Sequence, residues 1–224
     1  EIPVNAAANG PTTMWRLPSV VDLGDLDLFH APANILPRGL SMPCVTTIHD
    51  LMWLTEPQMC NRGFWGQIER RFYSHGIKHA LERSDAIVTV SEATHSDVVD
   101  LKPVSADRTF TALSGVSDTF SRGPVDPDIL EPLGLVPRQF VLTIGQNAPY
   151  KNHEGAIRGF ALAFAKNSEI DLVILQRRGQ GTGRLKRLTE SLGIAAKVHF
   201  LPPVDGSSLP QLYRGALALL HPSF

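Results

Sequence analysis

The sequence predicts an α/β protein in which parallel strands alternate with helices in two domains. Three observations predict it: eight short apolar runs, helical periodicity between them, and a proline-rich stretch after the fourth run. Parallel strands need crossover connections, and these are usually helices. The eight runs are residues 26–30, 45–49, 86–90, 109–113, 140–144, 172–175, 198–201 and 216–221.

Three of the intervening helices have recognisable ends. Ser91 can cap a helix that follows the third run, since a serine hydroxyl accepts from the first free backbone N–H groups. Gly193 can end the helix before the seventh run, because glycine adopts the left-handed conformation common at helix ends. Ser208 can open the helix before the eighth run.

The boundary between the domains is predicted from proline and glycine. Four prolines stand between residues 124 and 137, a density that discourages regular structure. We therefore place a linker at residues 118–137, between a first domain of residues 1–117 and a second of residues 138–224. A cleft between two such domains is the natural place for a site.

Composition excludes several classes of protein. The formal charge is −1 with a pI of about 6.8, which gives no electrostatic reason to expect nucleic-acid binding. No apolar run approaches the roughly 20 residues that span a membrane. Two cysteines, Cys44 and Cys60, are too few for a disulfide framework or a structural zinc site, so we expect a reducing cytoplasm. His75 and His79 lack the glutamate of an H-E-x-x-H metal motif.

The segment from Phe140 to Glu154 has the pattern of a phosphate-binding loop. An apolar strand ends at Gly145, which lets the backbone approach a ligand, and Asn152 can cap the helix that follows. Lys151 stands just before that helix, where a cation is unfavourable unless an anion lies between it and the positive end of the helix dipole. The alternative is an ordinary βα turn with a solvated lysine.

Histidines follow two strands of the first domain. His30 and His49 end the first and second runs, and Asp50 follows directly. Ligands in parallel α/β sheets bind outside the carboxyl ends of the strands, so these residues are candidates for binding a sugar hydroxyl or a proton. A lone histidine is more often a structural or surface residue, and Asp50 could simply cap the next turn. The Gly179-Gln180-Gly181 sequence is only a weak dinucleotide fingerprint.

The order of six segments gives a more specific indication. They are FHAPANILP, TIHDL, SDAIVTVSEATHSDV, SGVSDTF, VLTIGQNAPYKN and VHFLPPVDGSSLPQLYRGALALLHPS. This order, from about Leu26 to Phe224, resembles the family 4 (group 1) glycosyltransferases. The resemblance implies the GT-B fold, in which two Rossmann-like parallel-sheet domains face a cleft. Both domains are expected to be incomplete here: a first strand, and a pair of glutamates after Ser223, are expected to lie outside these residues.

The resemblance also assigns roles to residues. His49 and Asp50 correspond to the reaction centre, and His30 lies on the acceptor side. The donor phosphates are assigned to Gly145, Gln146, Lys151 and Asn152. Leu201 and Val204 belong to the loop that faces the nucleoside. Two departures are Gln146, where many relatives have arginine, and Pro202, where glycine is common.

The function implied is that of a retaining glycosyltransferase, which transfers a mannose- or glucose-like hexose from a nucleotide diphosphate sugar to an acceptor hydroxyl. The acceptor is a glycan or a lipid-linked glycan, in polysaccharide or glycoconjugate biosynthesis. Neither cofactor nor metal is expected, and we expect the 224 residues alone not to transfer sugar. The location expected is cytoplasmic, with peripheral attachment to the inner face of the membrane left open. Two alternatives are a non-catalytic nucleotide-sugar or glycan-binding protein and a dinucleotide-dependent oxidoreductase.

Overall fold

The computed structural model describes the chain except residues 1–3, 8, 61–62, 165, 167–168 and 177–181. The chain divides into two compact units, Glu1–Gly115 and Val116–Phe224, and each is described by itself. The Gly179-Gln180-Gly181 sequence lies outside the described residues.

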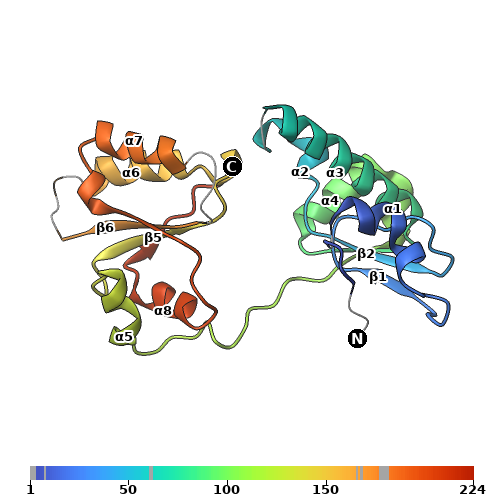
Figure 1. Ribbon diagram of the computed structural model, residues 1–224, viewed down its shortest axis with the longest axis horizontal. Coiled ribbons are helices and arrows are strands. Elements are labelled where there is room, and N and C mark those ends of the chain that lie inside the picture. Colours follow the sequence, from blue (N-terminus) through green and yellow to red (C-terminus); the bar gives the residue numbers. More distant parts are fainter. Residues whose placement is uncertain (1–3, 8, 61–62, 165, 167–168, 177–181) are drawn as a thin grey trace. The chain divides into compact units, whose positions relative to one another are not determined.

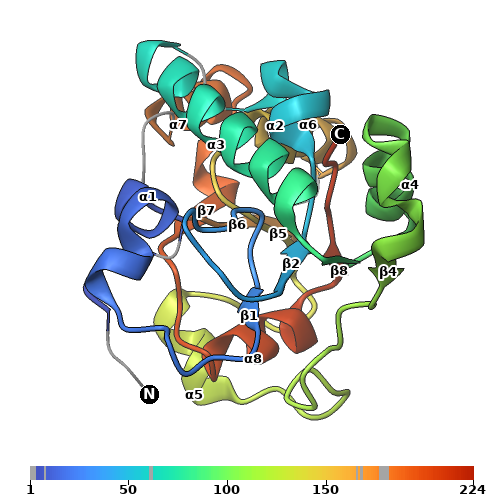
Figure 2. The same cartoon turned by 90° about the vertical axis from the view of Figure 1, so that its right-hand side faces the viewer.

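All eight predicted strands form, and they make two parallel four-stranded sheets, one in each unit. The first unit has strand order β1-β2-β3-β4. Its register pairs Phe29 with Cys44 and Val45 with Ala86. The strands are β1 (Phe29–Ala31), β2 (Cys44–Ile48), β3 (Ala86–Thr89) and β4 (Thr109–Thr111). The helices are α1 (Pro11–Val20), α2 (Met52–Thr55), α3 (Gly63–Arg83) and α4 (Glu92–Leu101), and Figure 2 shows α3 as one long, continuous helix.

The first sheet buries alternate residues. In β2, Cys44, Thr46 and Ile48 are buried, whereas Val45 and Thr47 between them are half-buried. The buried side packs against α3, whose Ile77 is fully enclosed in the same core cluster. Burying such a side chain stabilises the fold by about 1.5–3 kcal/mol. The core therefore holds the strands at fixed positions, and their carboxyl ends with them.

The second unit has strand order β7-β6-β5-β8. The strands are β5 (Phe140–Ile144), β6 (Asp171–Leu175), β7 (Val198–Leu201) and β8 (Ala218–Leu219). The helices are α5 (Pro127–Leu130), α6 (His153–Phe164), α7 (Thr182–Ser191) and α8 (Ser208–Gly215). Short 3₁₀ turns in the chain are η1 (Pro57–Met59), η2 (Pro103–Arg108), η3 (Glu131–Leu133), η4 (Pro149–Lys151) and η5 (Ala195–Lys197).

The second sheet is covered on both faces. Helices α6 and α7 lie on one face and α5 and α8 on the other (Figure 1). Strand β5 accordingly has four consecutive buried residues instead of an alternating pattern. Near-continuous apolar strands are what a parallel sheet buried on both faces requires.

The proline-rich segment is more regular than its composition predicts. Pro127 occupies the first position of α5, where its missing N–H costs no hydrogen bond, and the Asp126 side chain accepts from the backbone N–H of Asp128 at 3.1 Å. Leu130 and Leu135 then enter the core of the second unit. Proline here begins a helix, so the expectation of irregular structure is wrong for residues 127–133.

All three predicted helix ends are confirmed, although the capping group at one of them is a different residue. The Ser91 hydroxyl accepts from the backbone N–H of Thr94 at 3.1 Å, and Gly193 adopts φ +67°. Helix α8 does begin at Ser208, but the capping group is the Asp205 carboxylate, which accepts from the backbone N–H of Ser208 at 2.7 Å. Hydrogen bonds from the Ser207 hydroxyl and the Ser208 backbone lower the pKa of Asp205 to about 2.

We predict that Leu130→Ala lowers the free energy of unfolding by about 2–5 kcal/mol, because it opens a cavity in a fully enclosed position. Leu162→Ala is the matched control. Leu162 is 91% exposed on α6, so its loss should change stability by no more than about 0.5 kcal/mol. Urea unfolding measures both, and equal effects would contradict the assignment of Leu130 to the core.

Candidate functional site

The strand order of the second unit creates a favoured binding position at the end of β5. The connection after β5 leads through α6 to β6 on one side, whereas the connection after β7 leads through α8 to β8 on the other side. The helices therefore diverge to opposite faces between β5 and β8 (Figure 1). Such a switch point leaves a crevice at the carboxyl ends of the strands, where ligands of open α/β sheets bind.

The loop at that position begins with Gly145. Its φ of +152° is a conformation that side chains other than glycine rarely adopt. A Cβ built on Gly145 would lie 3.2 Å from both Cγ and Cδ of Lys151. The lysine stem therefore crosses directly over the glycine. The structure thus brings together the two residues that the sequence singled out first.

The Lys151 ammonium group lies over an aromatic ring. Its Nζ is 5.2 Å from the centroid of the Tyr150 ring, and the Tyr150 hydroxyl accepts from the Gln146 side-chain amide at 2.6 Å. No ion pair among the described residues involves Lys151. The loop therefore presents a cation whose charge no described carboxylate neutralises.

Asn152 connects this loop to α6 and to the end of the chain. It adopts the left-handed conformation with φ +49°, and its Oδ1 accepts from the backbone N–H of Gly155 at 3.1 Å, which confirms the predicted cap. Its Nδ2 donates to the Pro222 carbonyl at 3.2 Å, and the Phe224 N–H donates to the Tyr150 carbonyl at 3.0 Å. Both polar atoms of the Asn152 side chain therefore form hydrogen bonds within the second unit. Its role in phosphate binding stays a prediction.

The acidic residue nearest this loop in the sequence is paired. Glu154 accepts from Arg158 at 3.0 Å and also contacts Arg184. The hydrogen bond from Arg158 is the largest cause of the lowered pKa of this carboxyl. Two guanidinium groups thus offset a carboxylate that would otherwise repel an anion at the start of α6.

His153 is a residue of this loop that the sequence reasoning missed. It is the first residue of α6 and only 3% exposed. Its Nε2 lies 3.2 Å from the Gly145 carbonyl oxygen and 3.3 Å from that of Gln146. Burial lowers the pKa of His153 below its ordinary value of 6.5, and Lys151 and His221 act in the same direction. A histidine directly after a helix cap was the only signal in the sequence.

The two residues predicted to face the nucleoside lie at the end of β7 and in the loop that follows it. Leu201 ends β7 and Val204 lies in the loop before α8. Both side chains are partly buried against the core cluster that contains Leu130 and Leu212. Their part in nucleoside binding stays a prediction.

In the first unit, the backbone of His49 is held from two sides. Its N–H donates to the Asn34 side-chain oxygen at 2.7 Å, and its carbonyl accepts from the Thr94 hydroxyl at 3.2 Å. The Asn34 amide also donates to the Asp50 carbonyl at 3.1 Å. Asn34 therefore continues the contact between the β1 and β2 segments beyond the strands. Sequence reasoning missed it, because residues 34 and 49 meet only in the folded chain.

The His49 imidazole is oriented by a backbone group. Its Nε2 lies 3.1 Å from the Pro32 carbonyl oxygen. A carbonyl only accepts, so Nε2 must carry the proton and the Nδ1 of the neutral ring is an acceptor. The residue is exposed.

The two other residues predicted at the ends of β1 and β2 form hydrogen bonds within the first unit. His30 is exposed, and its Nε2 lies 2.9 Å from the Thr47 hydroxyl. Asp50 accepts from the Met52 backbone N–H at 3.1 Å, which is the capping role left open by the sequence. Their catalytic and acceptor roles stay predictions.

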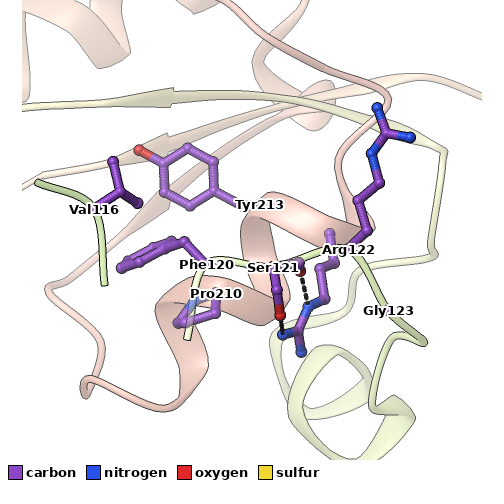
Figure 3. A pocket seen from close by; sticks show the side chains of 8 residues that line it. Val116, Phe120, Ser121, Arg122, Gly123, Pro210 and Tyr213 are labelled. Carbon is purple, nitrogen blue, oxygen red and sulfur yellow. Dashed lines mark hydrogen bonds between the residues drawn. The ribbon is translucent and has the colours of Figure 1, made fainter. Parts of the chain in front are cut away.

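A groove of about 680 Å³ lies elsewhere in the second unit (Figure 3). Its walls are the segment Val116–Gly123 and helix α8, where Phe120 and Tyr213 pack edge to face with ring centroids 5.6 Å apart. Arg214 donates to the Ser121 carbonyl at 2.8 Å and so ties the segment to the helix. None of the residues predicted to bind donor or acceptor lines this groove.

The part of the chain that the structure describes has neither a metal-binding cluster nor a membrane-spanning helix. It contains no group of three or more His, Cys, Asp or Glu side chains placed to hold a metal ion. None of its helices combines the length and apolarity needed to cross a membrane.

Comparison with known proteins decides the family. A family model described as Glycosyltransferase Family 4 matches residues 3–120, which is more than half of the chain. The chain belongs to glycosyltransferase family 4. A second model, described as Glycosyl transferases group 1, matches residues 128–224 of this family 4 chain. The predicted resemblance is therefore confirmed.

Curated relatives have glycosyltransferase names. The chain is 28% identical over 200 residues to an O-antigen chain mannosyltransferase B of Escherichia coli, an alignment that covers 88% of this chain and 51% of the relative. It is 36% identical over 99 residues to a D-inositol 3-phosphate glycosyltransferase of Rhodococcus jostii, covering 41% of this chain and 22% of the relative. The chain thus spans about half the length of the first of these relatives and less of the second.

Solved structures confirm the GT-B type of fold. The Anabaena protein HepE in complex with UDP-glucose matches with a TM-score of 0.64 at 16% identity, covering 81% of this chain and 47% of that one. WaaG, a glycosyltransferase involved in lipopolysaccharide biosynthesis, matches with a TM-score of 0.61 at 16% identity, covering 81% and 53%. These comparisons do not favour a dinucleotide-dependent oxidoreductase or a non-catalytic binding protein.

We predict that His153 makes the second unit less stable as the pH falls. Because its folded pKa lies below 6.5, the unfolded chain takes up the proton first, so stability is full above about pH 6.5 and declines below it. The measurement is urea unfolding of the unaltered chain and of His153→Gln between about pH 5 and 8. Below about pH 6.5 the unaltered chain should lose stability relative to His153→Gln. Above it, the difference in stability between the two should not change with pH. A difference independent of pH would contradict the lowered pKa.

Proposed function

We propose that the protein containing this chain is a retaining glycosyltransferase that transfers a mannose- or glucose-like hexose from a nucleotide diphosphate sugar to a hydroxyl of a glycan or lipid-linked acceptor. The process is polysaccharide or glycoconjugate biosynthesis. The observation that carries the proposal is the loop after β5, where the Lys151 stem crosses Gly145 at the switch point of the second sheet. The family membership and the names of the relatives support the same reaction class.

The chemistry of the loop suits a diphosphate. When the nucleoside diphosphate leaves the sugar, negative charge builds up on the phosphate oxygen that breaks away. A lysine ammonium and backbone N–H groups at fixed positions stabilise such a charge without reorganising. Lys151 supplies the cation, and α6 begins two residues later with its positive dipole end at the loop. We include in the proposal that this positive charge takes the place of a divalent metal ion.

The first unit would supply the reaction centre and the acceptor side. The backbone of His49 is fixed by Asn34 and Thr94, and its ring presents Nδ1 as an acceptor. An acceptor nitrogen on a neutral imidazole can receive a hydrogen bond from a sugar hydroxyl. We propose that His49 acts in this way, that Asp50 belongs to the same reaction centre, and that His30 lies on the acceptor side.

We predict that Lys151→Ala weakens binding of the nucleoside diphosphate by about tenfold or more, since a hydrogen bond to a charged group contributes about 1.5–3 kcal/mol. Isothermal titration of the complete protein with UDP and with GDP measures it. Lys186→Ala is the matched control, because Lys186 is an exposed lysine of α7 in the same unit and removes the same charge.

Three results would contradict the proposed binding and reaction, and a fourth would contradict only the proposed metal independence. Equal affinity of the Lys151 variant and the wild type for the nucleoside diphosphate would show that Lys151 does not bind the donor phosphates. Binding of NAD in preference to both nucleoside diphosphates would favour the oxidoreductase. Binding without hydrolysis or transfer of any donor sugar would favour a binding protein, and loss of transfer on addition of a chelator would contradict metal independence alone.

A further inference from the structure

His153 is a buried titratable residue to which the proposed reaction gives no role. It lies beneath the loop that carries Gly145 and Lys151, and its side chain is 3% exposed. A buried imidazole loses hydration, so it needs hydrogen-bond partners to be retained in the fold. Its partners are therefore informative about what the residue does.

Both partners of its Nε2 are backbone carbonyl oxygens. Those of Gly145 and Gln146 lie 3.2 and 3.3 Å away. Carbonyl oxygens only accept, so the Nε2 atom carries a hydrogen and shares it between them. The Gln146 carbonyl also accepts from the Ala148 N–H at 2.8 Å. One ring proton thus fixes the direction of two successive carbonyl groups.

The other ring nitrogen, Nδ1, determines whether the His153 ring is neutral or positively charged. Nδ1 is buried and has no hydrogen-bond partner among the described residues. A proton there would be a buried donor without an acceptor, and Lys151 and His221 would disfavour the added positive charge. Both nitrogens therefore favour the neutral ring with its hydrogen on Nε2.

Fixing a carbonyl also fixes the amide on the far side of the same peptide. The peptide unit is planar and trans, so its C=O and N–H point in opposite directions. The Gly145 carbonyl points toward the buried His153 ring. The N–H of Gln146 belongs to the same peptide unit, so it points away from that ring, and Gln146 is an exposed residue.

We propose that His153, as the neutral tautomer protonated on Nε2, is a positioning residue for the donor: it holds the Gly145–Gln146 peptide so that the Gln146 N–H faces outward as a hydrogen-bond donor for a diphosphate oxygen. Successive backbone groups fixed in this way form anion-binding concavities. The inference rests on the proposed function, because it assumes that this loop receives the diphosphate. It adds a backbone donor to the loop that carries Lys151.

The test compares two variants of similar size. His153→Gln retains an N–H at the end of the side chain, whereas His153→Leu retains the apolar volume without a donor. The complete protein and each variant are titrated with UDP, GDP and the two nucleosides lacking phosphate. We expect the leucine variant to bind the diphosphate about tenfold more weakly, as loss of one hydrogen bond predicts, with nucleoside affinity unchanged. The glutamine variant should restore most of the diphosphate affinity.

A purely structural role gives a different result. It would lower the unfolding temperature of the leucine variant but leave the ratio of diphosphate to nucleoside affinity as in the wild type, and this would overturn the inference. Failure of the wild type to bind either diphosphate would overturn the proposed function and the inference together. Normal binding by wild type and both variants would overturn the inference alone.

A second measurement needs no variant and so remains decisive if His153→Leu does not fold. A long-range proton–nitrogen NMR spectrum of the imidazole groups distinguishes the two neutral tautomers and the charged ring. Near neutral pH we expect His153 to carry its proton on Nε2 alone. A ring protonated on Nδ1, or on both nitrogens, would overturn the inference.

Discussion

The contact between the Lys151 stem and Gly145 is the constraint on which the rest of the second unit's candidate site depends. A side chain on residue 145 would meet the lysine at 3.2 Å, and the φ of +152° already favours glycine. The turn after β5 can therefore close tightly enough for a residue six positions later to return over the strand end. His153 then lies 3.2 Å from the Gly145 carbonyl oxygen, and the Tyr150 hydroxyl accepts from the Gln146 side chain. Their arrangement follows from one residue without a side chain at the end of a buried strand.

The topology gives this contact its significance. Strand β5 has β6 on one side and β8 on the other, and helices cover both faces of the sheet. The loop after β5 is thus placed where connections diverge, and core packing on both faces keeps the strand from shifting. A groove of about 680 Å³ lies beside Phe120 and Tyr213, and none of the residues predicted to bind the donor or the acceptor lines it.

Much of this could be predicted from the sequence, because strands and helix caps depend on local patterns. All eight apolar runs became strands, and Ser91, Asn152 and Gly193 mark helix ends as predicted. Long-range hydrogen bonds could not be predicted in the same way. Asn34 meets His49 across fifteen positions, and His153 turns inward toward two carbonyls. Leu130 was missed because proline density hid a helix that begins with proline.

In the first unit, hydrogen bonds fix the backbone at the candidate site, whereas the His49 side chain is less constrained. The His49 backbone is fixed at both its N–H and its carbonyl, while the imidazole is exposed and oriented through a single carbonyl. Asp50, which family resemblance assigns to the reaction centre, also caps the following helix. A capping carboxylate has a fixed position, which is a property that a reaction centre also needs. The structural and the proposed roles of these residues are therefore compatible.

The most direct test of a phosphate site after β5 is to map nucleoside diphosphate binding on the 224-residue chain by amide NMR. UDP and GDP are added separately, and the shift of each backbone amide is followed. If the loop after β5 is a phosphate site, the largest shifts should fall within residues 145–152, and inorganic pyrophosphate should reproduce them. Largest shifts along Val116–Gly123 and α8, with residues 145–152 unchanged, would contradict the account.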